Sequence, residues 1–266
     1  MDVHTRNNIS LTGVDGAPVL FLAHGFGCDQ NLWRPVVERL ESDFRMVLMD
    51  HVGSGASDPS AWDADKYSSL TAYADDILDI VRDLDLRDVV FVGHSVAAMM
   101  GALAVNADPT RFAKLVMLTP SPCYLDDADY RGGFSRADIE ELLESLEMNY
   151  LGWSHTMAPV IMGNPDRPDL SDELEATLCR TDPACARVFA RATFLSDNRE
   201  DLAQIPVPTL VIECAQDAIA PQGVGAYVRD RIPDSRLVTL SAVGHCPHVS
   251  DPEATARAIA AFAGPS

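Results

Sequence analysis

The chain has 266 residues, of which 47% are hydrophobic and 23% charged, a composition typical of globular proteins and unlike that of disordered or fibrous ones. Twenty Lys and Arg residues against forty Asp and Glu give a formal net charge of −20, which repels polyphosphate and anionic lipid and argues against nucleic-acid and membrane partners. The longest apolar run, Val96 to Val105, is far shorter than the ~20 residues that span a bilayer.

Short apolar runs alternate along the chain with longer amphipathic stretches. A continuous apolar run is typical of a parallel strand that is covered on both faces. Between two such runs, residues 71–84 carry apolar side chains near helical spacing. The alternation predicts an α/β fold with a mostly parallel central sheet and helices on both faces. The predicted strands are 19–23, 46–49, 89–92, 115–118, 210–212 and 237–240.

The alternation stops between residues 121 and 204, where helical patterns follow one another without a strand-like run. Ser135 and Asp138 have the spacing of a capping box and predict a helix through Asn149. Asp182 followed by Pro183 predicts a second helix start, running toward Leu195. We therefore expect a helical lid, residues 121–204, inserted in a core formed by 1–120 and 205–266. The lid would cover the carboxyl edge of the sheet, where open α/β sheets bind ligands.

The strand predicted at 89–92 runs into Gly93-His94-Ser95-Val96-Ala97, and a helix of small residues follows. Strand, G-x-S-x-G and helix together form a nucleophile elbow, which holds a serine on a tight turn above the sheet. Ala97 replaces the last glycine, a departure of one methyl group. The alternative is that Ser95 only caps the following helix. We favour Ser95 as a nucleophile because both flanking elements fit the motif.

A serine nucleophile needs a base and an acid that orients the base, and in this kind of fold the acid precedes the histidine in the chain. Asp217 and His245 each follow a predicted strand, so both would lie at the same edge as Ser95. Glu213 is the rival acid, but it falls within its strand, and we favour Asp217. His248 together with His245 could suggest a metal site, but the sequence supplies no further ligands at metal-binding spacing. We predict no metal and a loop or packing role for His248.

The oxyanion formed by serine attack needs two N–H donors. Val96, directly after the nucleophile, would supply one. The other would come from Phe26, because Gly25 and Gly27 on either side let the main chain turn its N–H inward. The alternative for this loop is an ordinary glycine-rich turn. A second glycine-rich segment, residues 53–57, lacks nucleotide-binding spacing and is interpreted as a structural turn.

Six cysteines are scattered through the chain and form no C-x-x-C pair. A chain of this length buries an adequate core without disulfides. The N-terminal segment lacks the layout of a secretory signal. We therefore expect reduced, mostly buried thiols in a cytoplasmic protein.

Several of these motifs resemble those of α/β hydrolases: His24-Gly-Phe-Gly, Asp50-His-Val-Gly-Ser-Gly, the elbow, and Gly244-His-Cys-Pro-His. More narrowly, the chain resembles the RsbQ-like subfamily, which comprises a bacterial regulator of the general stress sigma factor and related plant karrikin and strigolactone receptors. The similarity extends from about Ile9 to Phe262. The lid segments that carry the narrower resemblance are Ser121–Leu125, Tyr130–Phe134, Asn149–Trp153 and Phe194–Asn198.

The resemblance implies four lid helices arranged as a V over an apolar pocket, with a triad of Ser95, Asp217 and His245 and no cofactor. Met157 stands where relatives often have an aromatic residue, which implies a more deformable wall. Large apolar residues of a helical lid can equally form the core of the lid itself. The implied pocket residues are Phe26, Tyr124, Phe134, Leu142, Trp153, Met157, Phe194 and Ile219.

Two functions fit the sequence. The first is a serine hydrolase that acts on a small lipophilic ester or lactone. The second is a signalling regulator that senses a small apolar molecule with little turnover and acts with a PAS-domain phosphatase, as the resemblance implies. A binding protein without turnover fits less well because the triad is complete. Sequence alone does not separate the first two functions, since a receptor and an esterase can share every catalytic residue.

Overall fold

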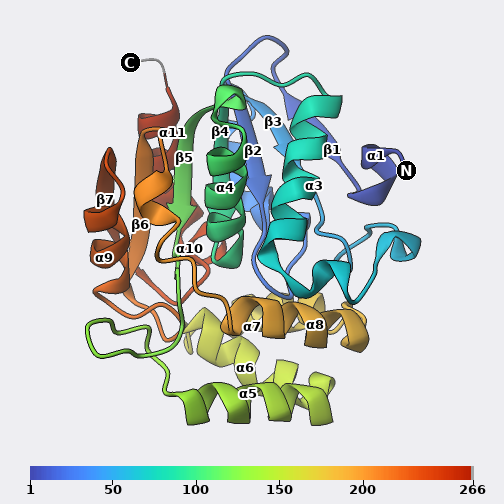
Figure 1. The fold of residues 1–266 in the computed structure, drawn as a ribbon, viewed down its shortest axis with the longest axis vertical. Coiled ribbons are helices and arrows are strands. Elements are labelled where there is room, and N and C mark those ends of the chain that lie inside the picture. Colours follow the sequence, from blue (N-terminus) through green and yellow to red (C-terminus); the bar gives the residue numbers. More distant parts are fainter. Residues whose placement is uncertain (265–266) are drawn as a thin grey trace.

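A computed structural model describes residues 1–264 of the chain. Within this range the strands form one seven-stranded sheet in the order β1-β3-β2-β4-β5-β6-β7, in which β1 pairs antiparallel with β3 and all other neighbours are parallel (Figure 1). The α/β-hydrolase fold expected from the sequence is confirmed. The strands are β1 (Ser10–Gly13), β2 (Val19–Ala23), β3 (Arg45–Leu48), β4 (Val89–His94), β5 (Phe112–Leu118), β6 (Thr209–Gln216) and β7 (Ser235–Val243).

Helices cover both faces of the sheet. One apolar core joins α3, α4 and α9 to one face, and another joins α2 and α11 to the other. None of the helices in residues 1–264 is long and apolar enough to cross a membrane. The core helices are α1 (Val3–Arg6), α2 (Arg34–Leu40), α3 (Leu70–Asp83), α4 (Val96–Ala107), α9 (Val224–Arg231), α10 (Pro247–Ser250) and α11 (Pro252–Ala263).

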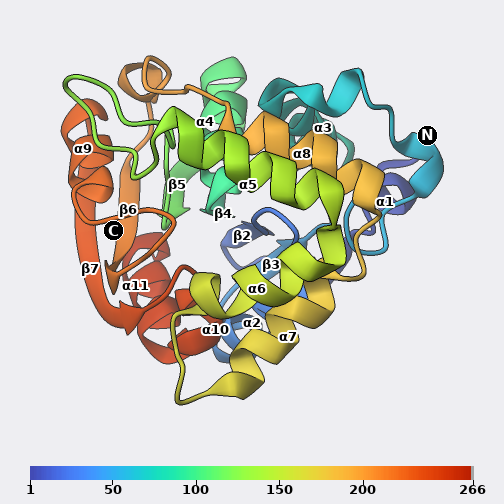
Figure 2. The same cartoon turned by 90° about the horizontal axis from the view of Figure 1, so that it is seen from below.

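Between β5 and β6 the chain leaves the core and forms α5 (Arg136–Met148), α6 (Tyr150–Met162), α7 (Pro168–Leu178) and α8 (Pro183–Phe194). These helices lie together across one end of the sheet, the end at which β4 gives way to α4 (Figure 1). Figure 2, seen from below, shows α5 beside α8 and α6 beside α7, with the sheet visible between the two pairs.

Both predicted lid caps are present. The Ser135 hydroxyl accepts from the Asp138 N–H at 3.2 Å, while the Asp138 carboxylate accepts from the Ser135 N–H at 2.7 Å. Asp182 accepts from the N–H of Ala184 at 2.7 Å and is followed by proline at the first position of α8. Each cap satisfies backbone donors that the first helical turn leaves free, so the local sequence fixes where these lid helices begin.

Candidate active site

Ser95 lies on a tight turn between β4 and α4, with φ 56° and ψ −124°. A non-glycine residue with positive φ is strained and persists where the surrounding structure holds it. Here the Ser95 N–H donates to the Leu118 carbonyl at 2.8 Å. Helix α4 returns so close to its strand that a Cβ at Gly93 would lie 2.4 Å from the Ala97 carbonyl oxygen. Glycine is required at residue 93 for this reason, whereas the extra methyl group of Ala97 is accommodated.

The structure brings Ser95, His245 and Asp217 together from three strand ends. The Ser95 Oγ lies 2.7 Å from the His245 Nε2, and the His245 Nδ1 lies 2.7 Å from the Asp217 Oδ2. The other carboxylate oxygen of Asp217 accepts from the N–H groups of Ile219 and Ala220 at 2.8 and 3.1 Å. A carboxylate fixed in this way holds the imidazole with Nδ1 protonated and Nε2 free to accept the serine proton.

Glu213, the rival acid, lies elsewhere. Its side chain accepts from the Thr239 hydroxyl at 2.8 Å and packs against Gly225. Their positions relative to β6 explain why Asp217 and not Glu213 contacts His245. Glu213 pairs with Thr239 inside the sheet, while Asp217 follows the end of the strand.

The backbone of His245 is held at both of its polar groups. Its carbonyl accepts from the His94 Nε2 at 2.8 Å and from the Thr119 hydroxyl at 3.1 Å. Its N–H donates to the Ile161 carbonyl of lid helix α6 at 2.8 Å. Core and lid therefore both contribute to placing the imidazole. Neither His94 nor Thr119 is assigned this position by a sequence motif, because the contact joins residues more than a hundred positions apart.

The loop that carries Phe26 follows β2 and is tied to the segment after β3. The His51 N–H donates to the His24 Nε2 at 3.1 Å, and the His51 Nε2 donates to the His24 carbonyl at 2.9 Å. Asp50 accepts from the N–H groups of Gln30 and Ala56, both at 2.9 Å. Residues 53–57 are thus a turn folded around a buried carboxylate, which agrees with the structural interpretation of this segment.

A cavity lies beside Ser95 and His245 under the lid. Of the implied pocket residues, Phe26, Tyr124, Leu142, Trp153, Met157, Phe194 and Ile219 all line it. Burial raises the pKa of Tyr124 to about 12, an effect that the nearby Ser95 hydroxyl partly offsets, so its phenol stays protonated at neutral pH. Several further residues that carry no pocket signal in the sequence also line the cavity: Cys28, His94, Ile161, Leu174, Leu178, Thr193 and Cys246.

Phe134 does not line this cavity. It lies in an outer groove between α5 and α6, to which Leu142, Trp153 and Met157 also contribute. The main chain of Phe134 is bonded to that of Tyr124, with its N–H donating to the Tyr124 carbonyl at 3.1 Å. The two rings lie 6.4 Å apart, so Phe134 supports the wall from outside.

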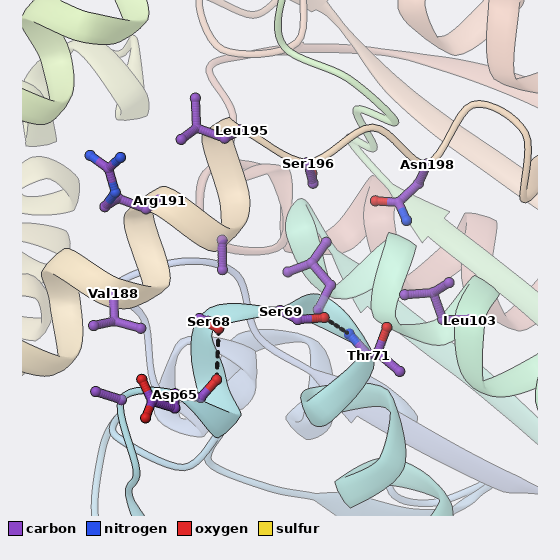
Figure 3. A pocket seen from close by; sticks show the side chains of 13 residues that line it. Asp65, Ser68, Ser69, Thr71, Leu103, Val188, Arg191, Leu195, Ser196 and Asn198 are labelled. Atoms are coloured by element: carbon purple, nitrogen blue, oxygen red, sulfur yellow. Dashed lines mark hydrogen bonds between the residues drawn. The ribbon is translucent and has the colours of Figure 1, made fainter.

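Another surface hollow lies between lid helix α8 and the core (Figure 3). The hollow is lined by Ser69 and Thr71 at the start of α3, Leu103 of α4, Arg191 of α8, and Leu195 directly after α8. None of the predicted site residues contributes to it. It is therefore separate from the cavity beside Ser95.

His248 packs between the rings of Trp33 and His94, at centroid distances of 4.6 and 4.4 Å. Burial lowers the pKa of His248 to about 3, so the ring is neutral. In residues 1–264, no group of three His, Cys, Asp or Glu side chains is arranged to hold a metal ion. All six cysteines lie in this range; none is in a disulfide, and Cys28, Cys123, Cys214 and Cys246 are buried.

The profile of the alpha/beta hydrolase family matches residues 19–258. The chain belongs to the α/β-hydrolase family. It is 38% identical over 251 residues to strigolactone esterase D14 of Arabidopsis thaliana, covering 94% of this chain and 93% of the relative. It is 34% identical over 252 residues to karrikin insensitive 2 receptor CA of Petunia hybrida, with the same coverage. The expected relation to the plant receptors is confirmed.

Among solved structures, a hydrolase from Oleispira antarctica superposes on this α/β hydrolase with a TM-score of 0.96. The two are 41% identical, and the match covers 98% of this chain and 96% of the other. Relatives named esterase or hydrolase thus match nearly the whole chain, which is an enzyme of the α/β serine hydrolase class.

Proposed function

We propose that this α/β hydrolase cleaves a small lipophilic ester or lactone with Ser95 as nucleophile, His245 as general base and Asp217 as the acid that orients it. The observation that carries the proposal is the continuous hydrogen-bonded chain from Ser95 through His245 to Asp217, beside a mostly apolar cavity. The Oγ–Nε2 and Nδ1–Oδ2 distances are both 2.7 Å. A nucleophile, base and orienting acid within hydrogen-bond reach are what acyl transfer requires.

In the proposed reaction the Ser95 Oγ attacks the carbonyl carbon while the His245 Nε2 takes its proton. The N–H groups of Phe26 and Val96 hold the oxyanion. Collapse of the tetrahedral intermediate expels the alcohol oxygen, which takes the proton from His245 and leaves an acyl group on Ser95. Water then attacks the acyl-enzyme with His245 as base, and release of the acid regenerates the serine. Asp217 stays ionised and stabilises the imidazolium.

The cavity supports a small, mostly apolar substrate. Aromatic and aliphatic side chains form most of its wall, and a few polar groups converge in it, which is the composition of small-molecule sites. Phe26 has edge-on contacts with Trp153 and Phe194, at centroid distances of 6.0 Å each, which gives the cavity a rigid aromatic side. Met157 supplies an unbranched, more adaptable side chain.

Hydrolysis of p-nitrophenyl butyrate by the wild type and Ser95→Ala tests this function. Loss of a triad nucleophile typically lowers kcat by several powers of ten, up to about 10⁶-fold. Ser42→Ala, at an exposed serine on the core surface, is the matched control and should retain full activity. Retention of more than a tenth of wild-type activity by a folded Ser95→Ala enzyme would show that Ser95 is not the nucleophile.

A second candidate is ligand sensing, and the receptor name of the petunia relative favours it. In this alternative the protein is RsbQ-like: it acts in stress signalling with a PAS-domain phosphatase, and turnover is slow. Co-purification of the two proteins, with and without the Ser95→Ala substitution, tests it. Failure to form a complex in cells and with purified proteins would leave the esterase function alone.

We also propose a cytoplasmic location, which six unpaired thiols support.

A further inference from the structure

Thr193, near the end of α8, contributes a hydroxyl-bearing side chain to the wall of the cavity beside Ser95. The residue lines this cavity and is 1% exposed. Its hydroxyl oxygen has no hydrogen-bond partner anywhere in residues 1–264. Its chain neighbour Phe194 lines the same cavity with an aromatic ring. A buried hydroxyl in such surroundings costs free energy unless something pairs with it.

Four other helical hydroxyls of the described chain avoid this cost by bonding to the carbonyl four residues earlier. The matching acceptor for Thr193 is the carbonyl of Phe189, four residues earlier, and this bond is absent from the described chain. The side chain is therefore turned away from the partner that a helix offers it. The hydroxyls that do donate to the carbonyl four residues earlier are Ser154 (2.8 Å), Thr156 (3.0 Å), Thr177 (2.9 Å) and Thr255 (2.9 Å).

We propose that Thr193 is a specificity-determining residue whose hydroxyl donates a hydrogen bond to an oxygen of the bound ligand. This inference rests on the proposed function and narrows its substrate class. The oxyanion already has two proposed donors in Phe26 and Val96, so Thr193 pairs with a second oxygen, away from the scissile carbonyl. The substrate is then a lipophilic ester or lactone that carries an additional ether, hydroxyl or carbonyl oxygen. An orphaned buried polar group at a site rejects an analogue that cannot pair with it.

Kinetics with matched esters test the contact. p-Nitrophenyl pentanoate is compared with its ethoxyacetate and 3-methoxypropanoate analogues, in which an ether oxygen replaces one methylene at different positions. Thr193→Val keeps the shape and removes the hydroxyl, while Thr193→Ser keeps the hydroxyl. For each ester, kcat/KM of the wild type is divided by that of the variant, which cancels the intrinsic reactivity of the ester.

For at least one of the two ether esters, the wild-type kcat/KM divided by the Thr193→Val kcat/KM should be about five times the same quotient for the pentanoate ester. A factor of about five corresponds to the loss of one neutral hydrogen bond. The ratio for Thr193→Ser should stay near one. Ratios for Thr193→Val that agree within twofold across all three esters would overturn the proposal.

Thermal unfolding without ligand gives an independent reading. Removal of an unpaired buried hydroxyl should raise the Tm of Thr193→Val by roughly 2–4 °C. Thr255→Val is the matched control: Thr255 is fully buried and its hydroxyl is already bonded within α11, so this Tm should fall. A fall in the Tm of Thr193→Val would show that the hydroxyl is already satisfied in the free protein and would overturn the proposal.

Binding separates this inference from the proposed chemistry. In a Ser95→Ala background, δ-valerolactone is compared with 1,4-dioxan-2-one, in which an ether oxygen replaces a ring methylene. Ligand-induced Tm shifts are measured with Thr193 and with Thr193→Val. A preference for the dioxanone that disappears with Thr193→Val supports the contact even if Ser95→Ala retains hydrolysis, a result that would overturn only the proposed nucleophile. Equal shifts for the two lactones at saturation would contradict the contact, whatever the outcome of the hydrolysis assay.

Discussion

The placement of His245 shows how single residues outside the proposed triad affect the geometry of that triad. The side chain is oriented by Asp217, but the main chain is fixed by donors from His94 and Thr119. Thr119 itself has φ 46°, in the left-handed region, and its N–H donates to the Ile212 carbonyl at 2.7 Å. A residue held in an unfavourable backbone conformation points to a constraint imposed by its surroundings. We regard Thr119 as a positioning residue that acts through His245.

Thr119→Val should lower kcat about fivefold, because one hydrogen bond of about 1 kcal/mol to the His245 carbonyl is lost. KM should change little, since Thr119 does not line the cavity. Thr119→Ser, which restores the hydroxyl, should restore kcat. Steady-state kinetics on p-nitrophenyl butyrate measure both constants. Equal kcat values for the Val and Ser variants would mean that the hydroxyl does not position the base.

Sequence motifs locate the residues that meet at strand ends, but not those whose position depends on lid packing. Ser95, Asp217 and His245 could be found because each follows a recognisable strand. Thr193 gave no such signal: a threonine near the end of an amphipathic helix is ordinary until the missing bond to its own helix is seen. For Phe134 the sequence instead suggested a pocket position that the residue does not occupy. A large apolar lid residue can face an outer groove as readily as the cavity.

At the scale of elements, the turn that carries Ser95 depends on how closely α4 returns to β4. A side chain at Gly93 would collide with main-chain atoms of Ala97, which cannot move without displacing the helix. Gly101, one turn further along α4, lies against the ring of Phe91, where an added Cβ would come within 2.5 Å. Small residues on this face therefore set the distance between helix and strand.

Gly93→Ala should destabilise the fold by about 3 kcal/mol, because the new methyl group overlaps the Ala97 carbonyl. Ala97→Gly, the reciprocal change toward the usual elbow motif, should cost only about 1.5 kcal/mol, through backbone entropy and one lost buried methyl group. Urea unfolding of the two variants measures the difference. Equal losses of stability would show that the close approach at residue 93 is relieved by a small backbone shift.

The predicted strands correspond to β2 through β7 because each contains an apolar run, and β2 to β6 are mostly buried. β1 (Ser10–Gly13) was not predicted, since it is a short edge strand whose residues are mostly exposed and carry no apolar run. β7 extends beyond the predicted 237–240 at both ends for a related reason: its outer residues alternate between exposed and covered positions. The central strands could be predicted because burial on both faces makes their sequences continuously apolar. The exposed strand β1 and the exposed ends of β7 lack that pattern and were missed.

At the scale of the whole molecule, neutral histidines buried behind the active site link its stability to pH. Burial lowers the pKa of His24, and lowers those of His51 and His94 well below the usual value. For His248 the pKa falls to about 3. All four residues are buried in the folded protein. Acidification must therefore place charge in a dry interior or unfold the chain.

Stability should fall as the pH drops from 6.5 to 5. Below about 6.5 the unfolded chain binds protons at these histidines and the folded protein does not, so each histidine removes up to about 1.4 kcal/mol per pH unit. Urea unfolding at pH 6.5 and pH 5 measures the loss. His248→Phe, which keeps an aromatic ring against Trp33, should reduce that loss by about 1.5 kcal/mol. His155→Gln, at an exposed histidine, serves as control, and an equal loss in both variants would contradict this account.

One backbone bond has a mechanical consequence for the assembly of lid and core. The amide of His245 is hydrogen-bonded to the carbonyl of Ile161, and Gly244 lies so close to the end of α6 that no side chain fits between them. If α6 moved away from the sheet, either this hydrogen bond would break or the imidazole of His245 would move with the helix. The position of α6 and the alignment of the Ser95–His245–Asp217 hydrogen bonds are therefore coupled through this contact.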